Sequence, residues 1–254
     1  MNTPPTVVWF RQDLRLQDNP ALDAAIARGG AVLPLFVLEE GVAGLRTPGG
    51  ASRWWLHHSL ASLDESLRQR GSRLLFARGH PDRIVRDLCG AVGAGAVYWN
   101  RRYDPGAIGL DAALKAQLGA DGVEAKSFNA GLLHEPQSIT NKQGRPFQVF
   151  TAFWRHCLSL PVAAPTKLRA GELPAPPSWP GSLSLAEFEL LPRIRWDAGL
   201  AETWQPGEAD AAQRLARFVA RGIHDYDRRR DWPGEEGTSR LSAALRFGDI
   251  SPRQ

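Results

Sequence analysis

The start of the fold can be read from the stretch VVWFRQDLRLQDNPALDAAIA, which spans residues 7–27. Its first four residues are β-branched or aromatic, which is typical of a buried strand. A polar turn follows, and Asn19 and Pro20 then stand where the N-cap and the first residue of a helix are expected. The stretch therefore predicts a strand, a turn and a helix in succession.

The same alternation continues through the first 130 residues. Short apolar runs predict strands over 31–38, 73–78, 96–100 and 125–128, and helical periodicity is found over 53–70, 82–92 and 110–118. The longest of these helices has an apolar stripe of Trp55, Leu56, Leu60, Leu63 and Leu67. Strands that alternate with helices at this spacing indicate βαβ units. We therefore expect an α/β fold with a doubly wound, Rossmann-like parallel sheet, and we place this domain at residues 1–135.

The chain changes character after the expected sheet. Six prolines fall between residues 161 and 180, a density that excludes regular helix or a central strand, and we expect a long linker over 136–205. Helical periodicity returns in Ala211, Leu215, Phe218 and Val219, so residues 206–254 are expected to begin an all-α domain. This second domain starts too late to bury a core of its own, which suggests an N-terminal fragment of a longer protein.

Composition excludes several classes of protein. Of the 254 residues 43% are hydrophobic and 23% charged, which is ordinary for a soluble globular protein and excludes wholesale disorder. No apolar run approaches the roughly 20 residues that span a bilayer, and the N-terminus has no secretory signal. Cys89 and Cys157 form no Cys-x-x-Cys pair, so we expect free thiols in a reducing cytoplasm.

The charged residues are biased towards arginine. The net charge is +4, and 27 of the 31 basic residues are Arg while 4 are Lys. Arg can clamp a phosphate group with two parallel hydrogen bonds, so the bias suits a phosphate-bearing partner. A coding preference for Arg explains the same bias without any ligand.

Several common catalytic motifs are absent from the sequence. The first junction between strand and helix has neither Gly-x-Gly-x-x-Gly nor a Walker loop, which argues against the usual dinucleotide fold and against an ATPase. The six histidines show no metal-ligand spacing, and there is no Gly-x-Ser-x-Gly elbow. Arg11, Asp13 and Arg15 in the first junction are candidates for a local lattice of ion pairs.

Residues 224–242 carry two features that point to a ligand. The tripeptide Gly-Thr-Ser at 237–239 precedes an apolar run and is expected to begin a helix. Such a start is either an anion site for a phosphate or a plain cap without a ligand. Three arginines at 228–230 stand between Tyr226 and Trp232, an arrangement that suits a nucleic-acid surface. Neighbouring aspartates favour a solvated salt-bridge network instead.

These and other stretches resemble the DNA photolyase/cryptochrome family. The runs YDRRRDWP at 226–233, EGTSRLS at 236–242 and LRFGDISPR at 245–253 are similar to the flavin-binding signature of the family. The opening run at 8–22 resembles its first strand and loop, and the runs at 52–56, 100–105 and 144–154 match in the same order. The resemblance covers residues 7–254 and indicates a protein like the class I cyclobutane pyrimidine dimer photolyases.

The resemblance implies an antenna domain, a linker and a helical FAD-binding domain, of which this chain would hold the first two and the first helices of the third. Tyr226 would contact the flavin. The phosphate and ribitol side of FAD would be lined by Thr238, Ser239, Arg240, Leu241 and Ser242. Arg230 would face the DNA, and the catalytic residues are expected beyond Gln254.

The activity implied is that of a deoxyribodipyrimidine photo-lyase. Light-excited reduced flavin would transfer an electron to a cyclobutane dimer in UV-damaged DNA and so split it. We expect a cytoplasmic monomer that has neither a membrane nor a metal as partner. The alternatives are a cryptochrome-type blue-light photoreceptor without repair activity and an α/β module that binds no flavin. With its flavin site incomplete, the 254-residue chain is expected to bind FAD weakly or not at all.

The sequence is compatible with more than one antenna chromophore. The folate-binding relatives carry an Asn-Glu pair shortly after the strand that corresponds to 97–100, whereas this chain has Gly106 and Ala107. The missing carboxylate argues against methenyltetrahydrofolate held in that way. A deazaflavin, a folate bound in another way, and no antenna at all are the three remaining interpretations.

Overall fold

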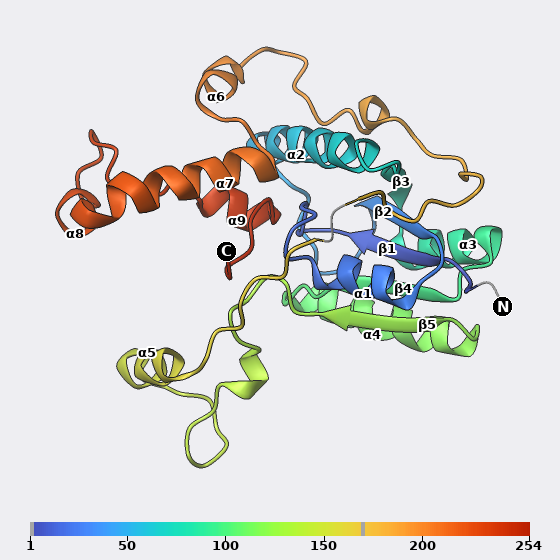
Figure 1. Ribbon diagram of the computed structural model, residues 1–254, viewed down its shortest axis with the longest axis horizontal. Helices are drawn as coiled ribbons and strands as arrows, with labels where there is room; N and C mark the ends of the chain where they lie inside the picture. Colours follow the sequence, from blue (N-terminus) through green and yellow to red (C-terminus); the bar gives the residue numbers. More distant parts are fainter. Residues whose placement is uncertain (1–2, 169–170) are drawn as a thin grey trace.

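Five parallel strands form one sheet in the order β3-β2-β1-β4-β5 (Figure 1). The computed structural model describes residues 3–168 and 171–254. Its strands are β1 (Thr6–Phe10), β2 (Val32–Glu39), β3 (Leu75–Gly79), β4 (Ala96–Asn100) and β5 (Glu124–Phe128). The predicted α/β fold with a doubly wound parallel sheet is confirmed.

Two helices cover each face of the sheet. Helices α1 (Pro20–Arg28) and α2 (Gly50–Arg68) pack on one face, and α3 (Pro81–Val92) and α4 (Pro105–Ala120) on the other. The predicted start of α1 is confirmed, because the Leu22 N–H donates to Asn19 Oδ1 at 3.2 Å. The apolar stripe predicted for α2 is buried along its whole length.

The chain between the sheet and the C-terminal segment is mostly irregular. Residues 161–168 and 171–180 contain no helix or strand, as their prolines predict. Among the linker residues that the structure describes, 136–168 and 171–205, four short helices are found: η1 (Pro136–Ser138), α5 (Phe150–Ser159), η2 (Leu185–Phe188) and α6 (Ala198–Thr203). We did not predict α5, which has no buried residue and stands clear of the sheet in Figure 1.

Part of this linker packs along β3, at one edge of the sheet. The Leu183 N–H donates to the Phe76 carbonyl at 2.9 Å and forms an isolated antiparallel bridge. Phe188, which is only 1% exposed, packs its ring against Phe36 and Phe76 with centroid distances of 6.1 and 5.6 Å. The linker is therefore fixed to the sheet here.

The last 49 residues form a helical arm. Helix α7 (Glu208–Arg217) continues through η3 (Phe218–Gly222) and η4 (Ile223–Asp225) into α8 (Tyr226–Arg229), and α9 (Ser242–Phe247) follows after a loop. The predicted helical periodicity is confirmed. Ala211, Leu241, Ala244 and Ile250 pack against tryptophans of α2, while α8 projects away from the sheet (Figure 1).

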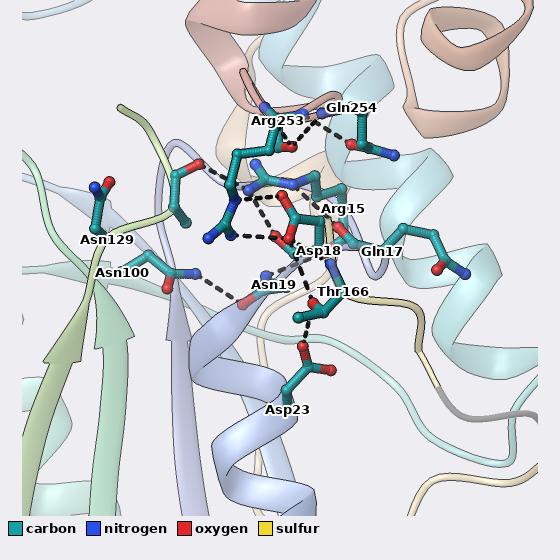
Figure 2. A network of polar contacts seen from close by, with 12 residues as sticks. Arg15, Gln17, Asp18, Asn19, Asp23, Asn100, Asn129, Thr166, Arg253 and Gln254 are labelled. Carbon is teal, nitrogen blue, oxygen red and sulfur yellow. Dashed lines mark hydrogen bonds and ion pairs between the residues drawn. The ribbon is translucent and has the colours of Figure 1, made fainter. Parts of the chain in front are cut away.

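A buried network of polar contacts joins the C-terminus to the first turn of the fold (Figure 2). The Arg15 guanidinium donates to the carbonyl oxygens of Gln17, Asp18, Ala130 and Gly248 at 2.9 to 3.1 Å. Arg253 lies 2.8 Å from the Asp18 carboxylate. Burial by itself would raise the pKa of Asp18, but hydrogen bonds from Ser251, Thr166 and Arg253 lower it below its usual value.

The local ion-pair lattice suggested for Arg11, Asp13 and Arg15 does not form. Arg11 instead pairs with Asp111 of α4 at 2.7 Å, and Asp13 accepts from the backbone N–H of Arg11. Arg15 donates to backbone carbonyls rather than to either neighbour. The side chain of Asp13 also accepts from Asn100 Nδ2 of β4 at 2.6 Å. The three side chains therefore reach different parts of the fold and do not pair with one another.

Candidate functional site

A pocket of about 800 Å³ lies at the carboxyl ends of the strands. Its walls come from the end of β2, from residues that follow β1, β2 and β4, from Arg78 of β3, from α2, and from the linker and α9. Open α/β sheets bind their ligands at this edge, near the point where the strand order reverses. The volume falls within the range of small-molecule and cofactor sites.

The lining of the pocket combines apolar rings with positive charge. The apolar part includes the side chains of Phe36, Leu38, Leu45, Leu56, Phe188 and Phe247. Six arginines line the same space: Arg11, Arg46, Arg53, Arg78, Arg102 and Arg246. Such a lining suits a planar apolar ring system that carries an anionic group.

The arginines of the pocket differ in their partners. Arg102 lies 2.7 Å from Glu39, Arg78 lies 3.7 Å from Glu40, and Arg11 is bidentate on Asp111. Within residues 3–168 and 171–254 no carboxylate partner is found for Arg46 or Arg246. These two guanidinium groups are therefore available to an anionic ligand.

The predicted flavin and DNA contacts at Tyr226 and Arg230 lie together on the helical arm. The Arg230 guanidinium is 5.7 Å from the centroid of the Tyr226 ring, and it lies 3.8 Å from the Asp231 carboxylate. Arg229 pairs with Glu235 at 2.7 Å. Tyr226 is 38% exposed and Arg230 is also exposed in part, so both are open to a ligand.

The helix predicted to begin at residues 237–239 begins three residues later. Helix α9 starts at Ser242 with Leu241 as its N-cap, and no side chain caps it. Arg240 has a left-handed backbone (φ +53°) and its guanidinium lies over the Trp204 ring, while Leu241 turns into the cluster around Trp54 and is 9% exposed. The helix begins only after this anchor, so the predicted helix start at 237–239 was wrong, and neither alternative for that start, an anion site or a plain cap, applies there. Phosphate binding by these residues in another geometry stays a prediction.

The donor groups of this loop nevertheless suit a phosphate-bearing cofactor. Thr238, Ser239 and Ser242 carry hydroxyls, and Arg240 adds a guanidinium that can donate to phosphate oxygens. Thr238, Arg240 and Ser242 are exposed, so they can cover one side of such a group. The side chain of Leu241 is buried in the cluster with Trp54 and Trp55, so the predicted flavin contact of Leu241 could be made only by its backbone.

Two buried carboxylates near the helical arm were missed by the sequence analysis. Asp249 accepts from Trp55 Nε1 at 2.8 Å and from Ser59 Oγ at 3.1 Å, and burial raises its pKa to about 6. Glu208 accepts from the backbone N–H groups of Leu16 and Gln17 at 2.8 Å, and burial raises its pKa as well. Their hydrogen-bond partners lie about 190 residues away in sequence, so no local sequence pattern could predict that these two carboxylates are buried and paired.

Other types of site find little support in the part of the chain that the structure describes. No group of three or more His, Cys, Asp or Glu side chains there is placed to hold a metal ion. None of its helices combines the length and the apolar character needed to cross a bilayer. Cys89 is buried, and burial raises the pKa of its thiol to about 12, so it is no ready nucleophile.

Known proteins of one family are similar to this chain. The family model described as DNA photolyase matches residues 6–176. A deoxyribodipyrimidine photo-lyase of Agrobacterium fabrum is 43% identical over 253 residues, which are 99% of this chain and 52% of that protein. Cryptochrome-1 of Arabidopsis thaliana is 38% identical over 260 residues, 98% of this chain and 37% of that protein. The chain thus spans about half or less of the length of these curated relatives.

Solved structures agree with these matches. A structure titled as a bacterial class III photolyase from Agrobacterium tumefaciens superposes with a TM-score of 0.94 at 43% identity, and the match covers 100% of this chain and 52% of that one. An archaeal photolyase from Sulfolobus tokodaii gives 0.79 at 26% identity, covering 98% and 53%. That archaeal photolyase is described as holding two FAD molecules, with the implication of a novel light-harvesting cofactor.

Proposed function

The chain belongs to the DNA photolyase family, and we propose that it acts in the light-dependent repair of cyclobutane pyrimidine dimers as a deoxyribodipyrimidine photo-lyase. The observation that carries the proposal is the 43% identity with a protein of that name over 99% of this chain. The class I subclass implied by the sequence stays a prediction. Similarity to a protein titled as class III favours that second subclass.

FAD is the cofactor that we assign to the helical arm. Bound FAD would supply a light-excited electron for splitting the dimer. The ring of Tyr226 would hold the flavin, and the loop Thr238–Ser242 would supply hydroxyl, guanidinium and backbone donors to its phosphate side. Arg230, beside Tyr226, would contact a phosphate of the damaged DNA. In this proposal the antenna domain spans residues 1–135, the linker spans 136–205, and the first part of the FAD-binding domain spans 206–254.

The pocket at the carboxyl ends of the strands is the antenna site in this proposal. Its apolar walls would bury a planar heteroaromatic chromophore, while Arg46 and Arg246 would hold an anionic tail. Methenyltetrahydrofolate has both parts, since its glutamate supplies the anionic tail. A deazaflavin has the planar ring system, and its acidic 8-hydroxyl supplies the negative charge. Gly106 and Ala107 supply no carboxylate, so a folate would depend on Glu39, Glu40 or Glu189 of the pocket instead.

A cryptochrome-type photoreceptor without repair activity is the second candidate. The 38% identity with Cryptochrome-1 over 98% of this chain favours it specifically. For either function we propose that the protein is a monomer in the cytoplasm. The cytoplasm is favoured because both cysteines are free and a reducing compartment keeps them so.

Light-dependent loss of a thymine dimer from a defined oligonucleotide tests the proposal. The protein is produced from its natural gene, loaded with FAD, reduced, and illuminated with near-UV or blue light beside a dark control. We expect dimer loss only in the light. Bound flavin without loss of the dimer would favour the photoreceptor, and a (6-4) oligonucleotide would then show whether a different lesion is the substrate.

A further inference from the structure

One wall of the antenna pocket is a loop without regular structure. Residues 40–49 join β2 to α2, and seven of them line the pocket: Glu40, Gly41, Val42, Leu45, Arg46, Thr47 and Pro48. A loop that forms so much of a binding wall defines the site only if it is held in one position.

The middle of this loop rests directly on the first turn of α4. A Cβ atom on Gly106 would lie 2.8 Å from the Ala43 carbonyl oxygen, 3.0 Å from the Gly44 carbonyl carbon and 3.0 Å from Leu45 Cδ2. From the other side, a Cβ on Gly44 would lie 3.4 Å from Gly106 Cα. Gly106 has ordinary helical φ, so the contact, and not its backbone conformation, requires glycine there.

Both ends of the loop are fixed as well. Before the loop, the Arg102 guanidinium lies 2.7 Å from Glu39 at the end of β2 and 3.1 Å from Asp104, the N-cap of α4. Arg102 therefore links the end of β2 to the start of α4. After it, Gly50 lies so close to Trp196 that a Cβ would be 2.8 Å from the indole Cζ2. The contact with Gly106 is the attachment nearest to Leu45 and Arg46, which line the pocket.

We propose that the backbone contact between Gly44 and Gly106 sets the affinity of the antenna pocket for its chromophore, because it fixes the position of the 40–49 loop that forms one wall of the pocket. The inference rests on the proposed antenna function. Any side chain at position 106 must push Ala43–Leu45 outward, and Leu45 and Arg46 would move with them. Gly106 itself does not line the pocket, so it acts as a positioning residue.

The first test compares two alanine variants of the same helix. Gly106→Ala disturbs the contact, whereas Gly109→Ala is the matched control, since a Cβ there meets nothing within 4 Å. The FAD-loaded protein is titrated with 5,10-methenyltetrahydrofolate and, separately, with 8-hydroxy-5-deazaflavin, each followed by fluorescence. We expect one of these probes to bind wild type and Gly109→Ala alike, and Gly106→Ala about tenfold more weakly. Equal affinity of the two variants for that probe would overturn the inference.

A second test needs no ligand. Arg46 is exposed in the loop, so trypsin cleavage after it reports on loop opening. We expect faster cleavage at Arg46 in Gly106→Ala than in wild type or Gly109→Ala. If wild type binds neither probe, the antenna proposal fails, yet the cleavage rates still decide whether Gly106 holds the loop. Unchanged cleavage would contradict that role.

A second pair of variants guards against misfolding of Gly106→Ala. Gly44→Ala places a methyl group in van der Waals contact with Gly106, 3.4 Å from its Cα, on the loop side of the contact. Gly93→Ala is its control, with a similar left-handed backbone but no atom within 4 Å of its Cβ. We expect Gly44→Ala to weaken probe binding and to speed cleavage at Arg46, and Gly93→Ala to do neither. If Gly44→Ala and Gly93→Ala gave the same affinities and the same cleavage rates, the contact between Gly44 and Gly106 would have no role.

Discussion

In β1 all five residues are buried, whereas in the helical arm, residues 206–254, the apolar residues Val219, Ile223, Trp232 and Leu245 are exposed. The sheet fills its interior with side chains from helices on both of its faces. The arm has few buried apolar residues, and most of them contact α2. Its position is fixed by polar contacts with the first turn of the fold, made through Arg15, Glu208 and Arg253. Asp249 adds a contact with Trp55 of α2.

This difference shows that the sheet and the helical arm are stabilised in different ways. The sheet is stabilised by its own core, since buried apolar area is the dominant favourable term in folding. The arm is ordered by attachment to that core. Removing an attachment should therefore affect the arm, and removing a contact within the exposed part of the arm should change little.

The largest effect is expected for Arg15→Ala. The substitution leaves the buried carbonyl groups of Asp18, Ala130 and Gly248 without their donor, and we expect a loss of about 3–5 kcal/mol in the free energy of unfolding. Urea unfolding followed by circular dichroism measures it. Arg68→Ala is the control, because the side chain of Arg68 is 57% exposed beside Asp64 and should contribute little. Similar losses in the two variants would refute the role of the Arg15 network.

Leu241→Ala should have the next largest effect. Its side chain is buried against the tryptophans of α2, so truncation removes the apolar anchor of the 238–247 segment, at a cost of about 2–3 kcal/mol. Amide hydrogen exchange of α9 and urea unfolding would both report the loss. Leu245→Ala, in the same helix but 44% exposed, should leave both unchanged. An equal effect of the two leucines would mean that the arm is not held by Leu241.

Asp249→Asn should make the attachment of the arm less sensitive to pH. Burial raises the pKa of Asp249 to about 6, above its ordinary value of 3.8, so its contribution to stability is full below pH 3.8 and is lost as the pH rises through about 6. The free energy of unfolding of wild type relative to the variant should therefore fall by about 1 kcal/mol between pH 5 and pH 7.5. Denaturant titrations at the two pH values measure this. A constant difference would show that Asp249 does not titrate in this range.

Arg230→Ala should have the smallest effect on stability and a specific one on DNA binding. Arg230 is about half exposed and its contact with Asp231 is long, so the free energy of unfolding should change by less than about 0.5 kcal/mol. Affinity for an oligonucleotide with a thymine dimer should fall several-fold while flavin content is unchanged. Arg83→Ala, an exposed arginine on α3, is the control. Unchanged affinity for this oligonucleotide would contradict a role in DNA binding and would leave Arg230 as a member of a surface ion pair with Asp231.

Local signals in the sequence predicted most of the sheet and its helices. The cap at Asn19, the stripe of α2 and the strand at 96–100 depend on neighbours within a few residues, so they could be read directly. The hydrogen bond from Arg15 to the Gly248 carbonyl joins residues 233 positions apart, and the sequence around either residue gives no signal that predicts it. Gly248 itself is required because a Cβ there would lie 2.1 Å from the Gln12 carbonyl oxygen.

The candidate sites could be predicted only in part for the same reason. Residues 226–242 carry a recognisable pattern, but Leu241 packs on α2 and so moves the start of α9, which a local analysis of Ser and Thr caps could not foresee. The antenna pocket draws its arginines from several separate segments of chain. Gly106 stood out as a departure from the folate-binding pattern, but its contact with the 40–49 loop becomes visible only in three dimensions.

The bridge between Leu183 and Phe76 has a consequence for self-association. The outer strands of a sheet present unpaired N–H and C=O groups that can recruit a strand from another molecule. At β5 the outer strand carries the charges of Glu124 and Lys126, which discourage such pairing. At β3 the linker occupies the pairing groups of Phe76. Detachment of the linker would open that strand while the rest of the sheet is still folded, so mild heating should lead to aggregation before it leads to unfolding.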